Sequence, residues 1–128
     1  GTNTSTGGGF LPVGSAASYF YGSFDGCNHT INGFYINRSS DWGVGLFDLF
    51  DGVLENTILE GFSVTGKSLV GGLVGHADAD VTRIAISNCH VRNGSVLGYA
   101  DSSAKGALAG SIYGADMRYR IRASFINY

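Results

Sequence analysis

The segment Ile31-Asn32-Gly33-Phe34-Tyr35-Ile36 decides the fold, because the chain repeats it. It returns 28 residues later as Leu59-Glu60-Gly61-Phe62-Ser63-Val64, with the apolar ends and the glycine kept. We place a third copy at residues 86–91 and a fourth at residues 121–126, at further offsets of 27 and 35 residues. Self-similarity at a period of about 20 to 50 residues is the signature of a repeat architecture.

A second block repeats with nearly the same offsets. Gly45-Leu46-Phe47 matches Gly72-Leu73-Val74 at 27 residues, and Ala107-Leu108-Ala109 lies 35 residues further on. The 35-residue shift also aligns three single pairs: Gly71 with Gly106, Gly75 with Gly110, and Arg83 with Arg118. Two blocks that share offsets indicate that whole repeats, not isolated motifs, are stacked.

The repeats predict short strands, because segments such as 57–64 and 83–91 are β-rich and are bounded by glycine or Asn-Gly turns. Apolar and polar residues alternate, so each strand has one face to bury. Stacking predicts two interior ladders: Ile31, Leu59, Ile86 and Ile121, and then Ile36, Val64, Val91 and Ile126. The expected fold is all-β, a three-faced parallel β-helix of about four coils, with the extra residues around 94–105 looping outward.

Length and charge set the outer limits. The 128 residues fit one domain, and a net charge of −2 gives no reason to expect nucleic acid as a partner. Apolar runs are far shorter than the roughly 20 residues of a membrane span, so no membrane insertion is expected. Residues 1–9 read as a flexible N-terminal tail or linker, residues 10–128 as the β-helix domain, and residues 10–24 as its capping or first-coil segment.

One stretch resembles a known family. Phe20-Tyr21-Gly22-Ser23-Phe24-Asp25-Gly26, followed by His29-Thr30-Ile31, resembles the opening of bacterial surface proteins that carry GLUG-type repeats. Residues 45–47 and 71–75 resemble the G-L-F and G-G-L-V-G elements of that repeat, although Cys27-Asn28 and Ala107 depart from it. The resemblance implies a right-handed parallel β-helix of an adhesin-like surface protein, with a role in display or spacing.

Four N-glycosylation sequons begin at Asn3, Asn28, Asn37 and Asn93, which favours a secreted, extracellular or cell-surface glycoprotein. The two cysteines show no metal-ligand spacing. In the alignment Cys89 shares the inward position of Phe34 and Phe62 in the third coil, two rungs from Cys27. Two rungs are about 9 to 10 Å, more than a disulfide spans, so we predict that the cysteines are not bonded to each other.

Signals for chemistry are weak. His29, His76 and His90 occupy different repeat positions, so neither a metal site nor a cofactor is expected. Asp78 and Asp80 near Arg83 are the one group that resembles a polysaccharide lyase site, but aspartates in such a turn usually cap it, and Asp25-Gly26 is likewise a turn signature. No nucleophile elbow or phosphate-binding loop occurs in the sequence, and we expect no enzyme activity.

The sequence therefore predicts a non-enzymatic structural module of an extracellular appendage, stalk or filament. The last strand carries the expected self-association edge, made of Ile121, Ala123, Phe125 and Ile126, and its expected partners are copies of the chain or adjacent domains. The alternative is a carbohydrate-binding or adhesive module with glycans as partners, and a polysaccharide-active enzyme comes third. Aromatic residues that would serve such a surface are Tyr19, Tyr21, Tyr35, Trp42, Tyr99, Tyr113 and Tyr119.

Overall fold

The computed structural model describes residues 8–15, 17–79, 84–100, 104–114 and 120–126. Within these residues every regular element is a β-strand, and no helix long and apolar enough to cross a membrane is found among them. The strands are β1 Ser23–Asn32, β2 Tyr35–Val44, β3 Phe47–Phe50, β4 Val53–Glu60, β5 Ser63–Gly71, β6 Val74–Ala79, β7 Ala85–Arg92, β8 Ser95–Gly98, β9 Lys105–Gly106, β10 Ala109–Gly114 and β11 Arg120–Ile126.

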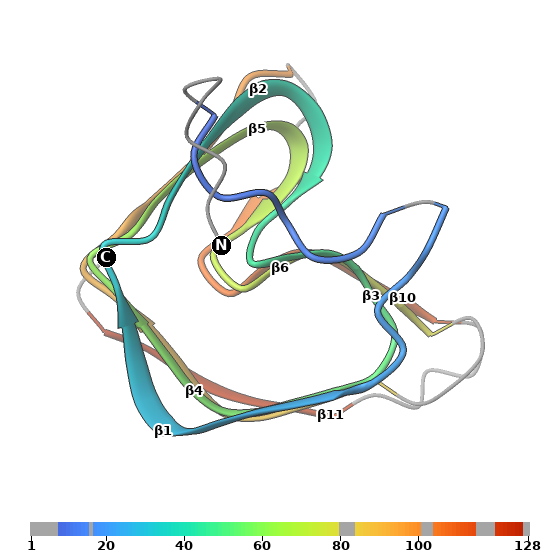
Figure 1. Ribbon diagram of the computed structural model, residues 1–128, viewed down its shortest axis with the longest axis vertical. Helices are drawn as coiled ribbons and strands as arrows, with labels where there is room; N and C mark the ends of the chain where they lie inside the picture. The colour runs from blue at the N-terminus through green and yellow to red at the C-terminus, as the bar shows by residue number, and fades with distance from the viewer. Residues whose placement is uncertain (1–7, 16, 80–83, 101–103, 115–119, 127–128) are drawn as a thin grey trace.

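These strands form three sheets, and all of the strand pairs in them are parallel. The first sheet has the order β1-β4-β7-β11, the second β2-β5-β8 with β9 also on β5, and the third β10-β6-β3. The chain visits the sheets in the same order each time, so that β1, β2 and β3 are followed by β4, β5 and β6 directly beneath them (Figure 1). The expected all-β chain with parallel sheets is confirmed.

The predicted ladders are correct for the first two repeats and wrong for the third. Ile31 pairs with Leu59, and Ile36 pairs with Val64, as expected. Leu59, however, pairs with Val91 and not with Ile86, and Val64 pairs with Val96 and not with Val91. In the fourth repeat Ile121 pairs with Ile86 as expected, but Val91 pairs with Phe125 and not with Ile126. The observed columns are Phe24, Leu54, Ile86 and Ile121; Ile31, Leu59, Val91 and Phe125; and Ile36, Val64 and Val96.

The error has a physical origin in two bends of the backbone. Asn56 and Gly61 both have positive φ, 55° and 63°, and each lies two residues after an apolar residue that points inward. Residues 54–59 and 59–64 therefore share one pattern, apolar-x-small-x-x-apolar, at a spacing of five residues. Residues 86–91 match either segment in pattern, but in the structure they lie beside residues 54–59.

The second block is confirmed, because Phe47 pairs with Val74 and Val74 with Ala109. Gly71 pairs with Gly106, as the 35-residue shift predicts. The extra residues of the third repeat are divided between two places, since the offset grows from 27 at Phe50 and Ala77 to 32 at Val53 and Ala85, and then to 35 at Val70 and Lys105. Part of the insertion thus precedes β7, instead of lying wholly within residues 94–105. Arg83 and Arg118 lie outside the described residues.

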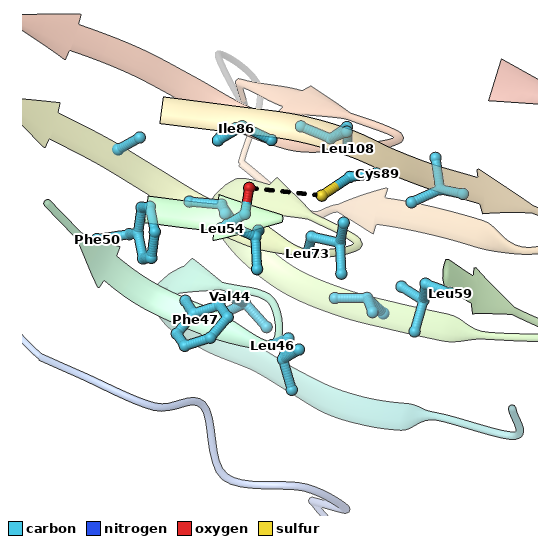
Figure 2. Packing of buried hydrophobic residues seen from close by; sticks show 14 of the residues in the cluster. Val44, Leu46, Phe47, Phe50, Leu54, Leu59, Leu73, Ile86, Cys89 and Leu108 are labelled. Atoms are coloured by element: carbon cyan, nitrogen blue, oxygen red, sulfur yellow. Dashed lines mark hydrogen bonds between the residues drawn. The ribbon is translucent and has the colours of Figure 1, made fainter. Parts of the chain in front are cut away.

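The core fills the space between the three sheets. Its fully buried side chains include Ile36, Phe50, Leu54 and Ile86, which come from all three sheets, and Leu73, which lies just before β6. These side chains belong to one hydrophobic cluster, and Figure 2 shows a part of it. No single circuit of the chain encloses such a core, so burial of apolar surface requires the stack.

The segment before β1 covers the first circuit. Val13 and Phe20 form parallel bridges with Phe47 and Phe50 of β3, and the Phe20 and Phe50 rings stack with centroids 5.5 Å apart. Gly8 O accepts a hydrogen bond of 3.0 Å from the Asn37 amide of β2. Residues 1–7 of the expected tail lie outside the described residues, and the division into tail and domain stays a prediction.

Candidate functional site

A row of asparagines marks the bend of the first sheet. Asn28, Asn56 and Asn88 occupy corresponding places on β1, β4 and β7, with φ of 62°, 55° and 50°. Asn88 Nδ2 donates to Oδ1 of Asn56 at 2.8 Å and to Oδ1 of Asn28 at 3.1 Å. Asparagine tolerates the left-handed region better than other non-glycine residues. The row therefore secures the bend and links successive circuits.

Asp25 on β1 is hydrogen-bonded to this asparagine row. Its Oδ1 accepts hydrogen bonds from the Cys27 amide at 2.8 Å and from Asn56 Nδ2 at 3.0 Å. The Cys27 amide, and then the Asn56 amide, lower the pKa of the Asp25 carboxyl by stabilising its charged form. This is the turn role that the sequence predicted for Asp25.

The three described sequon asparagines differ in surroundings. Asn28 belongs to the asparagine row, and Asn93 Nδ2 lies 3.4 Å from Glu60 Oε1, beside the Glu60 to Arg92 ion pair of 3.2 Å. Asn37 is exposed on β2. Asn3 lies outside the described residues. Glycosylation of all four stays a prediction.

The histidines do not come together. His29 is exposed on β1, His90 Nε2 lies 3.2 Å from Asn88 Oδ1, and His76 Nε2 lies 3.8 Å from Asp78 Oδ2 on β6. Asp80 and Arg83 lie outside the described residues. Among the residues that are described, no cluster of histidine, cysteine, aspartate or glutamate has the makings of a metal site.

Both cysteines are free, which confirms the predicted absence of a bond between them. The predicted place of Cys89 is wrong, because the pairing of Ser63 with Ser95 puts Gly94 next to Phe62. Cys89 instead lies in the core, where its thiol is 3.7 Å from the Leu54 carbonyl oxygen (Figure 2). Burial raises the pKa of the Cys89 thiol. Cys27 is exposed at the bend of β1.

The exposed aromatic side chains are distributed over the surface. Tyr35 and Tyr99 are exposed on the second sheet and just after it, and Tyr19 stacks on Tyr21 with centroids 5.7 Å apart. Trp42, near the end of β2, is 56% exposed. The Tyr113 side chain and Tyr119 lie outside the described part of the chain.

Trp42 is pushed outward by an irregularity in β2. Arg38 pairs with Gly66 and Trp42 with Ser68, so three residues of β2 stand opposite one residue of β5. Such a bulge bends a strand and redirects its side chains, and bulges are frequent beside functional sites. Here the bulge places Trp42 at the wall of an open cleft of about 490 Å³, which we call the Trp42 cleft.

The Trp42 cleft has an apolar wall and two carboxylates. Leu11, Pro12 and Trp42 supply its apolar lining, and Asp41 and Asp48 supply its carboxylates. Burial raises the pKa of Asp48 to about 6, and the nearby Asp41 charge acts in the same direction. A cleft with an aromatic wall, a few polar groups and a perturbed pKa is the usual form of a binding site.

Gly43 and Lys67 complete the surroundings of Trp42. Gly43 has φ of 71°, and a Cβ at this position would overlap Asp48 Oδ1, so only glycine lets the carboxylate lie against the β2 backbone. Lys67, the residue of β5 within the bulge, places Nζ 5.6 Å from the centroid of the Trp42 ring. Arg38 Nη1 lies 3.9 Å from Asp41 Oδ2, a loose surface pair.

Sequence reasoning named Trp42 among the aromatic candidates but missed Asp41, Asp48 and Lys67. A signal was present, because the repeat offset falls from 28 at Ile36 and Val64 to 26 at Val44 and Val70. That fall locates the bulge between those residues. The asparagine row was missed for a related reason, because its spacing of 28 and then 32 residues requires the correct third register.

The predicted self-association residues lie on β11. Backbone pairing puts Ile121 beside Ile86, Ala123 beside Cys89 and Phe125 beside Val91. Ile126 pairs with Arg92. Within the described residues β11 is the edge strand of the first sheet, opposite β1. Its contact with another molecule stays a prediction.

Two curated proteins show similarity to the chain. Halomucin of Haloquadratum walsbyi is 38% identical over 97 residues, 72% of this chain and 1% of halomucin. A protein of Evansella cellulosilytica that is named as a Gly-rich membrane protein is 31% identical over 83 residues, 61% of this chain and 10% of that protein. The chain thus spans a small fraction of both relatives. No family model and no solved structure matches it.

Proposed function

We propose that the chain is a right-handed parallel β-helical segment that serves as a non-enzymatic structural module of a secreted or cell-surface protein. The observation that carries this proposal is the cyclic order of the three parallel sheets, in which each circuit of the chain lies on the previous one. A stack of this kind is rigid along its axis and lengthens by adding circuits. Those properties suit a spacer or stalk.

The relatives support a surface location. Halomucin and the Gly-rich membrane protein carry names of surface-type proteins, and both exceed this chain many times in length. The sequons and the GLUG-like motifs also favour a surface location. We therefore propose that the chain belongs to the surface proteins with GLUG-type repeats. The edge strands β1 and β11 would pair with neighbouring circuits of a longer chain or with another copy.

Two measurements test this function. Immunogold labelling of the producing cells, with antibodies against the chain, should mark the cell surface or shed material, and labelling confined to the cell interior would contradict the proposal. Negative-stain electron microscopy of the purified chain shows whether the edge strands pair with another copy or with circuits of a longer chain. Filaments support head-to-tail pairing of copies, whereas dispersed particles support pairing within a longer polypeptide.

The Trp42 cleft favours a second function, binding of carbohydrate. An exposed indole beside carboxylates offers an apolar face for a sugar ring and acceptors for its hydroxyl groups. The two functions are compatible, since a spacer that carries binding sites is an adhesin-like module. A glycan array probed with the purified chain tests this second function, and a uniform absence of binding would contradict it.

A further inference from the structure

The Trp42 cleft has a charge pattern that selects among sugars. Asp41 and Asp48 both line it, and none of the described residues that line it is basic. The Asp48 side chain has no hydrogen bond or ion pair with any residue of the described part of the chain, and Asp41 has only the loose contact with Arg38. The two carboxylates give the lining of the cleft a negative charge, which is complementary to a positively charged ligand.

The indole adds a second interaction with positive charge. Lys67 Nζ already lies 5.6 Å from the ring centroid, so the Trp42 ring holds a cation in this fold. Cation–π attraction is strongest for tryptophan among the aromatic side chains. The same ring gives an apolar platform for the carbon-bound hydrogens of a pyranose.

The backbone holds these groups in place. The bulge in β2 fixes the direction of Trp42, and the absence of a side chain at Gly43 lets Asp48 approach the backbone beside it. Leu11 and Pro12 also line the cleft. The cleft is therefore formed by main-chain geometry before any ligand arrives, which reduces the entropy lost on binding.

We propose that the Trp42 cleft binds an amino sugar with a free ammonium group, its ring against Trp42 and its ammonium between the carboxylates of Asp41 and Asp48. This inference rests on the carbohydrate-binding function proposed above and narrows it to a cationic class of sugar. Hydrogen bonds between an ammonium and a carboxylate are stronger than those between neutral groups. The fully N-acetylated sugar has the same ring but no such charge.

The test is isothermal titration calorimetry of the full chain with three tetrasaccharide probes: a β-1,4-linked glucosamine tetramer, its N-acetylated form and a glucose tetramer. We expect the glucosamine tetramer to bind at least about tenfold more tightly than the other two, which corresponds to one charge-assisted hydrogen bond. Trp42→Ala and Asp48→Asn should each weaken glucosamine binding by about tenfold or more. Circular dichroism checks that both variants are folded.

Tyr99→Ala is the matched control, because Tyr99 is also an exposed aromatic residue but does not line the cleft. It should leave the affinity unchanged. Equal affinity for the acetylated and free tetramers would overturn the amino-sugar inference and leave carbohydrate binding standing. Absence of binding by all three probes would overturn the inference, and a blank glycan array in addition would remove carbohydrate binding altogether. Unchanged binding by Trp42→Ala would move the site elsewhere and overturn the inference.

Discussion

The side-chain amide of Asn88 donates a hydrogen bond of 2.8 Å to Oδ1 of Asn56, one circuit earlier in the stack. The same amide reaches Asn28, two circuits earlier. Both Asn56 and Asn88 hold left-handed backbone conformations that permit the bend of the first sheet. One side chain thus joins the local turn to the stacking of circuits.

Replacement of Asn88 should separate these two contributions. Asn88→Ala loses the two hydrogen bonds that Nδ2 donates and the 3.2 Å contact of Oδ1 with His90, and it leaves at φ 50° a residue whose side chain cannot support that conformation. We expect a loss of about 2 kcal/mol in the free energy of unfolding. Asn88→Gly loses the same hydrogen bonds without backbone strain and should cost about 1 kcal/mol less. Urea denaturation measures both, and equal losses would contradict the role of the backbone conformation.

The cysteines should differ sharply in reactivity. Cys27 is exposed, whereas Cys89 is buried with a raised thiol pKa, so Cys89 has little reactive thiolate in the folded chain. In a thiol titration with Ellman's reagent we expect one fast-reacting thiol in native protein and two after unfolding in guanidinium chloride. The Cys27→Ser variant should lose the fast phase. A fast phase that persists in that variant would contradict the interior position of Cys89.

The sequence was sufficient for the parallel all-β architecture, because apolar positions and glycines recur together at residues 31–36 and 59–64. It was insufficient for the third register. A column of strands tolerates any apolar residue that fits inward, so Ile86 matched Leu59 as well as Leu54 in pattern. The bend at Asn56 and Asn88 decides between these two registers. The pattern of apolar residues does not predict the backbone conformation of an asparagine.

The candidate site was predicted only in part for a similar reason. An exposed tryptophan on a β-rich surface can be recognised from the sequence, but its neighbours depend on the bulge between Arg38 and Trp42. Asp48 lies on β3, in a different sheet from Trp42. The two line one cleft because the chain bends at residues 45–46, between β2 and β3. Such proximity depends on the turn geometry and not on the composition.

The raised pKa of Asp48 predicts a dependence of stability on pH. Its folded pKa of about 6 exceeds the ordinary value of 3.8, so its contribution to stability is fully present below about pH 4 and is lost as the pH rises through 6. Asp41 is the charged group that raises this pKa further. On β6, His76 pairs with Leu49 and so lies on the opposite face of the sheet from Asp48.

Asp48→Asn removes the titration and keeps the shape of the side chain. At pH 7.5 it should raise the free energy of unfolding by about 1 kcal/mol, a value reduced for the partial exposure of Asp48 to solvent. At pH 4 the variant and the parent chain should be equally stable. Thermal unfolding of the variant and of the parent chain at both pH values checks this. An equal gain at both pH values would contradict the assignment to Asp48.

Two glycines should respond differently to the same substitution, because they are needed for different reasons. A Cβ at Gly71 would overlap the Val74 carbonyl oxygen and lie 2.8 Å from Ala109 Cα, both of them backbone atoms that cannot move independently. A Cβ at Gly33 meets no atom within 4 Å, although φ is 73°. Gly71→Ala should therefore cost about 3 kcal/mol through overpacking, and Gly33→Ala about 1 kcal/mol through backbone strain alone.

Urea denaturation of the two alanine variants measures these losses, and a further substitution separates their causes. Gly33→Asn should recover part of the loss at Gly33, because asparagine tolerates positive φ and Asn93 fills the corresponding bend of the third circuit. Gly71→Asn should be no better than Gly71→Ala, since the obstacle there is space between strands β5 and β10 and not conformation. If asparagine instead rescued position 71, the close approach of those strands would not be the reason that glycine is required there.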